Sequence, residues 1–590
     1  MFSRTTYSHK KMRFRFLIST IGFFLALLFS LSSSYTIVHS KGSQQTRPVS
    51  LEISVPEPPR IGNFDTTIGY DAAYFPIIEN LFLGLTDYDP HQQAIVPEIS
   101  THWEVSEDNL TWIFHLRDDV NWVHYATETE TVNVVRPVKA SDFVFGIKGA
   151  CDSRRNNSYS QIIAETIVGC DLVYNTPASE TTDDLVYGES IAVSAPDSVT
   201  LVITLQKPAS HFLALTTLPI MRAQPQEVVE QYGSDWTANA TLVSNGPYVQ
   251  KLFDPDTESQ FIRNEFLPSD LFKSDGNIDV VYLKYMTGIG IELLMYQQNE
   301  LDSARVSPLD IEFIRSDEQL SKELIEINDN RILYFGFNYD RAPFDNIHVR
   351  RAFSAIIDRQ LFVENTWFQG GIPIAHLTPP DFPNGELPNE SSIGFDPVYA
   401  RTQLSLAGYP ECQNIPTIEI ITQNMAMAEF WRDSAVQYLK CDPSVFVIGL
   451  DEPTPSMDPD YTPPTADTWL TGFIGAYPDA MAFLHIFHCE TTTQYREVSY
   501  LFQRPCTAVD TLFDSLLMEN DPEKRQTLIF AIEEALFGEE GEFPVAPLFV
   551  PIDYFLVKPW LTGPFQIDGV LGMTHWDAYH VDMELKDSSS

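Results

Sequence analysis

A histidine cluster has side-chain types and spacings that could bind a metal. His485 and His488 are three residues apart, so they can share a helix face, and the adjacent Cys489 could join them as a zinc ligand. However, Cys506 offers Cys489 a disulfide partner, and an oxidised sulfur is a poor metal ligand. We therefore interpret this cluster as structural.

An acidic loop is the second group of residues that could do chemistry. Asp254, Asp256 and Glu258 alternate along it. A calcium loop also needs a central glycine and a distal bidentate glutamate, and neither is found at the required position. The pattern is typical of a solvated turn. The sequence predicts no metal ligand and no cofactor.

The spacings that mark common catalytic sites are missing from the sequence. HExxH, GxSxG, the Walker A pattern, GxGxxG and CxxC do not occur. With 81 acidic residues, a carboxylate pair for acid–base catalysis could be chosen almost anywhere, so such a pair carries no information. We predict that the protein is not an enzyme.

Residues 467–484 (DTWLTGFIGAYPDAMAFL) form the segment best suited to bind a ligand. The segment begins as a buried strand, loses its bulky side chains at two glycines and ends in Tyr-Pro-Asp. Such a strand exposes backbone N–H and C=O groups beside Phe473. This combination is typical of a cleft that holds an extended or planar ligand. The alternative is an ordinary strand followed by a helix that Asp479 caps.

Strands and helices alternate along the chain, which predicts an α/β architecture. At 590 residues the chain is too long for a single core, so several lobes are expected. The elements follow from hydrophobic periodicity and capping residues. The main predicted strands cover residues 51–55, 111–116, 199–205, 331–338 and 417–422. The main predicted helices cover residues 72–83, 143–150, 349–362 and 522–537.

The charge of the chain excludes two classes of partner. Its 37 basic and 81 acidic residues give a formal net charge of −44. Binding to nucleic acid or anionic lipid depends on clustered Lys and Arg, so neither is predicted as a partner. A solvated acidic surface explains the charge, and a preference for cationic ligands is the alternative.

The first 40 residues have the pattern of an export signal. A basic segment at residues 10–15 precedes an apolar core at residues 16–31, which is short for a membrane span. Small or branched residues stand before Lys41 at the positions that cleavage requires. We predict a signal peptide over residues 1–40 and an exported protein, periplasmic or at the cell surface. An uncleaved N-terminal anchor is the alternative.

Six cysteines fit a compartment outside the cytoplasm. Six cysteines allow 15 pairings, and we favour the sequential one because it keeps the partners local. A strand and a returning helix between Cys412 and Cys441 bring their outer ends together, where a disulfide could close. The predicted pairs are Cys151–Cys170, Cys412–Cys441 and Cys489–Cys506.

Several segments, taken in order, resemble the extracellular solute-binding proteins of ABC importers, in the family that includes oligopeptide- and dipeptide-binding components (family 5). Residues 137–145 look like the family's P-V-T-A-x-D-F signature. The matching segments cover the chain almost from end to end. They are residues 77–85 (IIENLFLGL), 96–105 (VPEISTHWEV), 110–122 (LTWIFHLRDDVNW), 137–145 (PVKASDFVF), 244–248 (SNGPY), 337–358 (FNYDRAPFDNIHVRRAFSAIID) and 556–560 (LVKPW).

This resemblance implies an α/β, two-lobed periplasmic-binding-protein-like fold (type II, cluster C) with an extra small domain. The lobes would close over a ligand by hinge motion, and the closed form would dock on a membrane permease. The implied protein is a monomer without catalytic activity. The implied domains are lobe I at residues 48–90, 185–325 and 545–586, the small domain at residues 91–184, and lobe II at residues 326–544.

The resemblance also implies where the ligand binds. In the peptide binders the backbone that matches residues 472–476 pairs with the peptide, and an aromatic residue stands where Phe473 is. Other contacts would come from the small domain, from a lobe I loop and from a C-terminal segment. The implied ligand-binding residues are Tyr70, Asp71, Ala72, Tyr159, Gly472, Phe473, Ile474, Gly475, Ala476, Tyr477, Asp479 and Phe549.

Two positions depart from the oligopeptide-binding pattern. Those proteins have an Asp just before the Tyr of this segment, which neutralises the α-amino group of the peptide, and here that residue is Ala476. Some of them also have an upstream Arg, which is Leu470 here. Burying an ammonium group without a counter-charge is costly, and Asp479 could replace the missing charge only if the loop turned it inward.

The sequence thus predicts the substrate-binding component of an ABC importer, with a peptide or peptide-like solute as ligand. The departures keep a second possibility open, in which the same fold binds a metal chelate, an oligosaccharide or an opine. A third is an extracellular sensor module that does not transport.

Overall fold

The computed structural model describes most of the chain after the predicted signal peptide, which itself lies outside the described residues. No helix among the described residues is long and apolar enough to cross a membrane. The described residues are 47–55, 64–68, 75–155, 157, 159–273, 276–286, 290–328, 330–367, 370–380, 382–383, 385, 387, 392–450, 466–490, 504–568 and 574–589.

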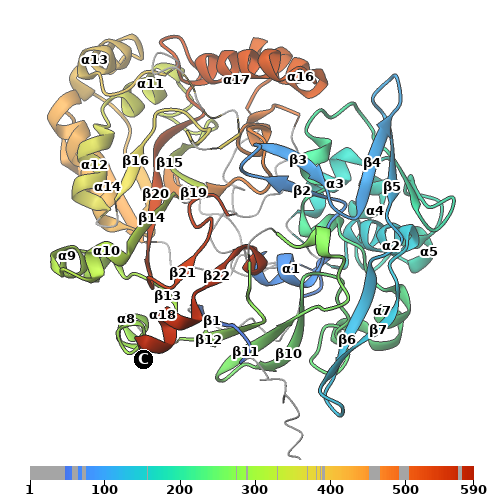
Figure 1. The fold of residues 1–590 in the computed structure, drawn as a ribbon. Helices are drawn as coiled ribbons and strands as arrows, with labels where there is room; N and C mark the ends of the chain where they lie inside the picture. The colour runs from blue at the N-terminus through green and yellow to red at the C-terminus, as the bar shows by residue number, and fades with distance from the viewer. Residues whose placement is uncertain are drawn as a thin grey trace, which may run out of the picture. The chain divides into compact units, whose positions relative to one another are not determined.

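A sheet of 12 strands joins segments that lie far apart in the sequence (Figure 1). Its order is β10-β11-β12-β1-β13-β20-β15-β19-β17-β18, and β14 and β16 also pair with β20. Its strands are β1 (Ser50–Val55), β10 (Tyr248–Asp254), β11 (Glu258–Arg263), β12 (Val280–Tyr285), β13 (Ser303–Arg305), β14 (Leu324–Asn328), β15 (Arg331–Phe337), β16 (Gly371–Pro373), β17 (Ile418–Thr422), β18 (Phe446–Leu450), β19 (Thr468–Ile474) and β20 (Val545–Val557).

Strand β20 connects the two halves of this sheet. Its first part pairs with β15 and β16, and its second part pairs with β13 and β14. The chain crosses between the halves a second time where β14 leads into β15. Figure 1 shows β20, in red, among these partners. Two adjacent crossing segments are a suitable place for two lobes to hinge.

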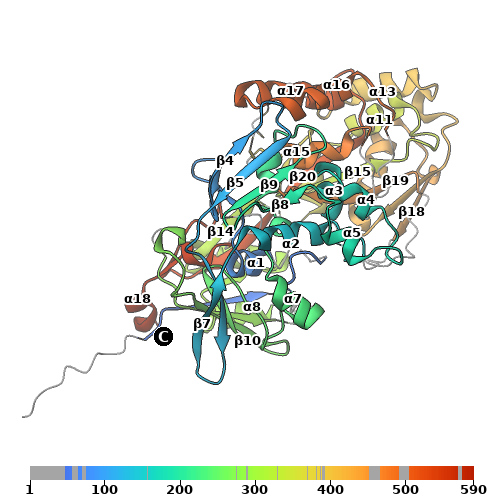
Figure 2. The ribbon, with the colours of Figure 1, turned by 90° about the vertical axis from the view of Figure 1, so that its right-hand side faces the viewer.

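A four-stranded antiparallel sheet has the order β4-β5-β9-β8 (Figure 2). Its strands are β4 (Ser100–Val105), β5 (Thr111–Leu116), β8 (Val193–Ser194) and β9 (Thr200–Thr204). The alternation predicted for β5 is confirmed, because Trp112, Phe114 and Leu116 are buried while the residues between them are half-buried. Since β8 and β9 follow residue 184, we propose that the small domain extends beyond its predicted end to include them.

Three pairs of strands form smaller sheets. They are β2 (Thr86–Asp89) with β3 (Ala94–Pro97), β6 (Asn121–Ala126) with β7 (Thr131–Pro137), and β21 (Leu561–Thr562) with β22 (His580–Val581). The hairpin of β10 and β11 contains the acidic loop, and its Asp254 accepts hydrogen bonds from within that turn.

The α-helices are distributed along the whole described chain. They are α1 (Phe75–Leu81), α2 (Ala140–Ala150), α3 (Ser160–Thr166), α4 (Cys170–Tyr174), α5 (Asp183–Tyr187), α6 (Phe212–Leu215), α7 (Gln226–Tyr232), α8 (Ile291–Gln297), α9 (Ile311–Ser316), α10 (Leu320–Glu323), α11 (Ile347–Ala355), α12 (Arg359–Thr366), α13 (Pro397–Leu406), α14 (Met425–Ser434), α15 (Met481–Leu484), α16 (Ala508–Met518), α17 (Pro522–Phe537) and α18 (Met583–Ser588).

Two helices differ from their predicted bounds for reasons of capping. Helix α2 begins at Ala140, three residues before the predicted start, because Asp142 accepts from the backbone N–H of Lys139 and so closes the first turn there. The single helix predicted at residues 349–362 is two helices, α11 and α12. Asp358 caps the second of them by accepting from the N–H of Leu361.

A second hydrophobic core is built around Trp431 on α14. Its side chain has no exposed surface. Its ring stacks on Phe335 with centroids 4.6 Å apart, and its Nε1–H donates to the carbonyl of Phe353 at 3.0 Å. Strand β15 and helices α11 and α14 are thereby packed into one aromatic layer.

The three predicted disulfides are confirmed. They join Cys151 to Cys170, Cys412 to Cys441, and Cys489 to Cys506. The second closes the strand–helix unit between β17 and β18, as the sequence indicated. Because Cys489 is oxidised, the histidine cluster beside it lacks a thiolate ligand, which supports its structural interpretation.

Removing the disulfide between Cys412 and Cys441 is expected to lower the free energy of unfolding by about 3 kcal/mol. The bridge limits the unfolded chain over a separation of 29 residues. Urea denaturation of the double Cys→Ser variant, compared with the unchanged protein in oxidising buffer, measures this loss. When all three disulfides are reduced, the two proteins should have the same free energy of unfolding. Equal free energies of unfolding without reductant would contradict the prediction.

Candidate functional site

One edge of strand β19 is open over most of its length. On one side, β19 pairs with β15 from Thr468 to Ile474. On the other side, β17 pairs only with Thr468 and Trp469. No other described strand pairs with residues 470–474. The predicted strand is therefore confirmed, and it presents backbone polar groups at an edge where an extended ligand could add as a strand.

The ladder between β19 and β15 determines which backbone groups face this open edge. The N–H of Gly475 donates to the carbonyl of Asn330 at 3.2 Å. At the other end of the ladder, the N–H of Asn338 donates to the carbonyl of Asp467, which is also an odd-numbered residue. Antiparallel pairs alternate between bonded and non-bonded, so the odd-numbered residues of β19 bond to β15. The N–H and C=O groups that face the open edge belong to Leu470, Gly472 and Ile474.

The two glycines of this segment have different roles. A Cβ at Gly475 would lie 2.5 Å from the ring of Phe483 and 3.1 Å from that of Phe382, so close packing requires glycine there. A Cβ at Gly472 would meet the side chain of Arg331 at 3.1 Å, a closer contact than side chains usually make. Close packing explains why residue 475 is glycine. Gly472 is packed less tightly, and it also lies at the open edge.

The side chains that follow β19 lie among aromatic residues. Phe473 is half-buried and meets Phe483 edge to face, with ring centroids 6.0 Å apart. Ala476 is also half-buried. Tyr477 is buried and stacks on His211 at 5.7 Å, with an interplanar angle of 21°. Through this stack, the segment after β19 contacts the chain between β9 and α6.

Asp479 does not face an open edge. Its Oδ2 accepts from the guanidinium of Arg525 at 2.6 Å, and its Oδ1 accepts from the N–H of Met481 at 2.9 Å. The residue thus caps the turn that leads into α15 and forms an ion pair with α17. Its carboxylate is already neutralised, so it does not replace the counter-charge missing at Ala476.

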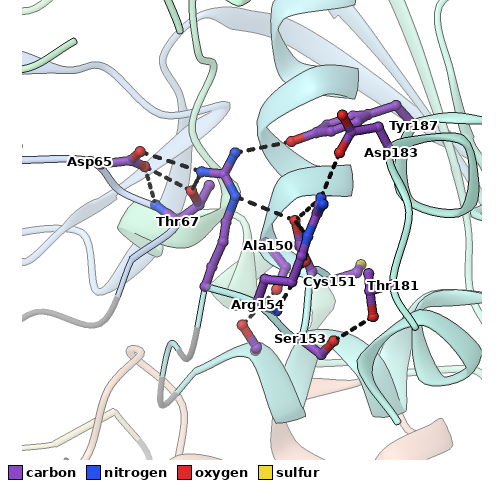
Figure 3. Close-up of polar contacts among 12 residues, drawn as sticks. Asp65, Thr67, Ala150, Cys151, Ser153, Arg154, Thr181, Asp183 and Tyr187 are labelled. Carbon is purple, nitrogen blue, oxygen red and sulfur yellow. Dashed lines mark hydrogen bonds and ion pairs between the residues drawn. The ribbon is translucent and has the colours of Figure 1, made fainter. Parts of the chain in front are cut away.

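The loop that carries Tyr159 is joined to residues 64–68 of lobe I (Figure 3). The guanidinium of Arg155 donates to the hydroxyl of Thr67 and, at 3.0 Å, to that of Tyr187, and it lies 3.3 Å from the carboxylate of Asp65. Burial lowers the pKa of Arg155, but Asp65, Tyr187 and Asp152 together outweigh burial, so the pKa lies above its ordinary value.

Asn157 supplies the second connection between these two segments. Its side-chain amide donates to the carbonyls of Thr66 and Ile68 at 3.4 and 3.2 Å, and its Oδ1 accepts from the N–H of Tyr159 at 2.8 Å. The ring of Tyr159 then packs against Phe75 of α1 at 6.2 Å. The position of Tyr159 is therefore fixed by lobe I.

The remaining predicted ligand residues are placed less favourably or are not described. Tyr70, Asp71 and Ala72 lie outside the described residues. They follow residues 64–68 in the sequence. Phe549 has no exposed surface, because it packs between Trp367 and Phe362 inside lobe II. In this conformation a ligand does not reach its ring.

A contact between a histidine and a carboxylate brings the segment after β19 next to helix α3. The Nε2 of His485 lies 3.5 Å from the carboxylate of Glu165, on the helix that follows Tyr159. The hydroxyl of Ser210 donates to the carbonyl of Leu516 at 3.0 Å. The open edge of β19 and the Tyr159 loop are thus linked through α3. Sequence reasoning missed these partners, because nothing in the local pattern marks them.

Lowering the pH is expected to weaken the packing around His211. Burial, with His485 and Arg525 nearby, lowers the pKa of His211 to about 3. An unfolded histidine titrates near pH 6.5, so the stability that the neutral ring contributes is complete above about pH 6.5 and is lost as pH falls toward 3. Between pH 7 and 5 this loss is about 2 kcal/mol.

The variant His211→Phe keeps the aromatic stack and removes the titration. Urea denaturation at pH 7 and at pH 5 should show a smaller pH-dependent loss for the variant than for the unchanged protein. His91→Phe, at an exposed turn, serves as the control. Because the other histidines are the same in the variants and in the unchanged protein, the difference in pH dependence reports the substituted histidine. An unchanged pH dependence in His211→Phe would contradict the prediction.

Comparison with known proteins places this geometry in a family. The family model for bacterial extracellular solute-binding proteins, family 5 Middle, matches residues 94–494. The chain belongs to this family. Its members are solute-binding proteins rather than enzymes, and the resemblance of the sequence segments is thereby confirmed.

Two curated relatives and a solved structure cover most of the chain. The periplasmic murein peptide-binding protein MppA of Escherichia coli is 25% identical over 567 residues, covering 91% of this chain and 94% of MppA. The periplasmic oligopeptide-binding protein OppA of Escherichia coli is 23% identical over 506 residues, covering 82% and 84%. The unliganded open form of MppA has a TM-score of 0.69 at 23% identity, covering 90% and 97%. This likeness confirms the two-lobed α/β fold.

Proposed function

We propose that this chain is the extracytoplasmic substrate-binding component of an ABC importer, which captures a peptide or peptide-like solute between its lobes and delivers it to a membrane permease. The open edge of β19 is the observation that carries the proposal. An extended peptide can add to such an edge as a further strand, and main-chain hydrogen bonds then supply affinity. The names of the relatives, which bind oligopeptides and murein peptides, support this ligand class.

The proposed site combines the three parts of the fold. Lobe II contributes residues 472–477, with Phe473 beside the edge, and the small domain contributes Tyr159. Lobe I contributes the segment that leads to residues 70–72. We propose the domain ranges given in the sequence analysis, with the small domain extended to include β8 and β9. We further propose that residues 1–40 direct export and that the protein acts as a monomer.

Recognition of the ligand through its backbone follows from the missing counter-charge. Ala476 carries no charge, and Asp479 is neutralised by Arg525. The described part of the segment after β19 therefore offers no unpaired carboxylate for a peptide α-amino group. A ligand with a blocked or neutral terminus would avoid the cost of burying an unpaired ammonium.

A calorimetric comparison of short peptides with free and with N-acetylated termini tests the proposal. The exported protein should bind peptides, and acetylation should leave the affinity unchanged or raise it. Ala476→Asp should shift the preference toward the free amine. Ala476→Asn, which has a similar size and no charge, is the matched control. The peptide assignment would fail if no peptide bound, and the recognition mode would fail if acetylation abolished binding.

A non-peptide ligand is the second candidate, and the pairing of Asp479 with Arg525 favours it, because the site then lacks the usual charge for a peptide terminus. A thermal-shift screen should test metal chelates, oligosaccharides and opines beside short peptides. A ligand from one of these classes that raises the melting temperature when no peptide does would select this candidate.

A further inference from the structure

Two histidines face each other on the small domain, away from the proposed ligand site. His102 on β4 and His115 on β5 are directly opposed in the antiparallel register, after an irregularity between Ser100 and His102. Their rings stack with centroids 4.4 Å apart and an interplanar angle of 12°. Figure 2 shows the two strands side by side in the small sheet. The pair lies on the outer face, because Phe114 and its alternate neighbours point into the core.

The hydrogen bonds of Thr101 determine which nitrogen of His102 carries a lone pair. The hydroxyl of Thr101 donates its single proton to the carbonyl of His115 at 3.0 Å. The same oxygen lies 3.0 Å from Nδ1 of His102, so it accepts there and Nδ1 carries the proton. Nε2 of His102 then has a free lone pair. A partner that fixes the other ring nitrogen in this way is typical of histidines that bind metals.

Glu104 adds a carboxylate to the pair. It lies two residues after His102 on the same strand, so its side chain leaves the same face of the sheet. Its Oε1 is 3.4 Å from Nε2 of His115, an atom that is itself shielded from solvent and makes no hydrogen bond. One ligand atom from each of the three residues lies within 4.8 Å of the others. The Glu104 side chain is 66% exposed, so it can adjust its rotamer.

We propose that His102, Glu104 and His115 bind a divalent transition-metal ion such as Zn²⁺ or Cu²⁺. Two imidazoles and one carboxylate are a ligand set that such ions prefer, whereas Ca²⁺ and Mg²⁺ prefer oxygen ligands alone. Three protein ligands leave further coordination positions to water. The strongly negative net charge of the chain raises the local concentration of cations. The site is independent of the proposed ligand at β19.

A bound ion would fasten β4, the outer strand of its sheet, to β5. We therefore expect Zn²⁺ to raise the melting temperature of the protein as well as to bind it. This effect would connect the stability of the small domain to the supply of transition metal outside the cytoplasm.

Calorimetric titration of the metal-free exported protein with Zn²⁺ tests the proposal. Excess Ca²⁺ should be present so that the many surface carboxylates are occupied by a hard cation. We expect one equivalent of Zn²⁺ to bind, and we expect His102→Ala and His115→Ala each to weaken that binding by at least about tenfold, the loss that even indirect metal contacts can cause. Glu104→Gln should weaken it in the same direction.

His91→Ala is the matched control, since His91 is exposed on a neighbouring turn outside the cluster. It should bind Zn²⁺ like the unchanged protein. Cu²⁺ electron paramagnetic resonance gives an independent measurement, in which the hyperfine coupling should change from that of two nitrogens to that of one at most in His102→Ala. Because His102 is exposed, this variant should fold even if His115→Ala does not. The proposal is overturned if His102→Ala binds Zn²⁺ unchanged and keeps the two-nitrogen Cu²⁺ signal.

Discussion

Replacing Asp65 by alanine is expected to lower the free energy of unfolding by about 3 kcal/mol, because it removes the nearer of the two carboxylates that compensate the buried guanidinium of Arg155. Asp65 is only 3% exposed. Its carboxylate lies beside Arg155 and also accepts from Nε1 of Trp236 at 2.8 Å and from the amide of Gln224 at 2.5 Å. The substitution would leave all three donors in the interior with one acceptor fewer.

Urea denaturation measures this loss, and a double-mutant cycle separates its causes. Asp65→Ala combined with Arg155→Ala should cost less than the sum of the single substitutions, because the double variant also removes the buried cation that Asp65 compensates. Asp254→Ala, in the exposed turn between β10 and β11, is the control and should change stability little. A change below about 1 kcal/mol in Asp65→Ala would show that this carboxylate does not anchor the network.

Ile474→Pro is expected to weaken binding of a peptide ligand by about tenfold or more while the fold is retained. Ile474 is an even-numbered residue of β19, so its N–H faces the open edge and not β15. Proline removes that donor and places its ring at the edge, and prolines are tolerated where the N–H faces outward. One main-chain hydrogen bond contributes about 1 kcal/mol, and exclusion of the approaching strand by the ring adds to this loss.

Two controls separate the lost donor from other effects. Ile474→Ala removes the side chain but keeps the N–H, so it should retain most of the affinity. Phe473→Pro removes a donor on the opposite side, which bonds to β15, and it should destabilise the fold in thermal denaturation. If Ile474→Pro binds peptide as tightly as Ile474→Ala does, the open edge is not where the ligand pairs.

Strands, helices and disulfides could be predicted from the sequence because they depend on residues that are close along the chain. The alternation in residues 111–116 places Trp112, Phe114 and Leu116 in the core whatever the partner strands are. The disulfides followed from proximity along the chain. The errors lie at helix boundaries, where a capping side chain such as Asp358 decides the outcome. The pairing of β9 with β5 could not be predicted, because the two strands lie far apart in the sequence.

The ligand site could be predicted only in part from the sequence. The sequence placed a strand and two glycines at residues 467–475, and it identified Ala476 as the departure from the peptide-binding pattern. It could not show that Asp479 is neutralised by Arg525, because the two residues lie 46 positions apart. It also could not show that Phe549 is enclosed, since an apolar strand residue is equally suited to a core or to a cleft.

The sequence by itself therefore determined the family, the class of fold, the export signal as a prediction and the identity of the segment at β19. These properties depend on residue order and short-range periodicity. The tertiary structure decided which edge of β19 is open, which carboxylates are neutralised, and that His102 meets His115 across a hairpin. The open edge and the meeting of the two histidines depend on strand register, and a shift of one residue would turn every side chain to the opposite face. The pairing of Asp479 with Arg525 depends on where α17 packs.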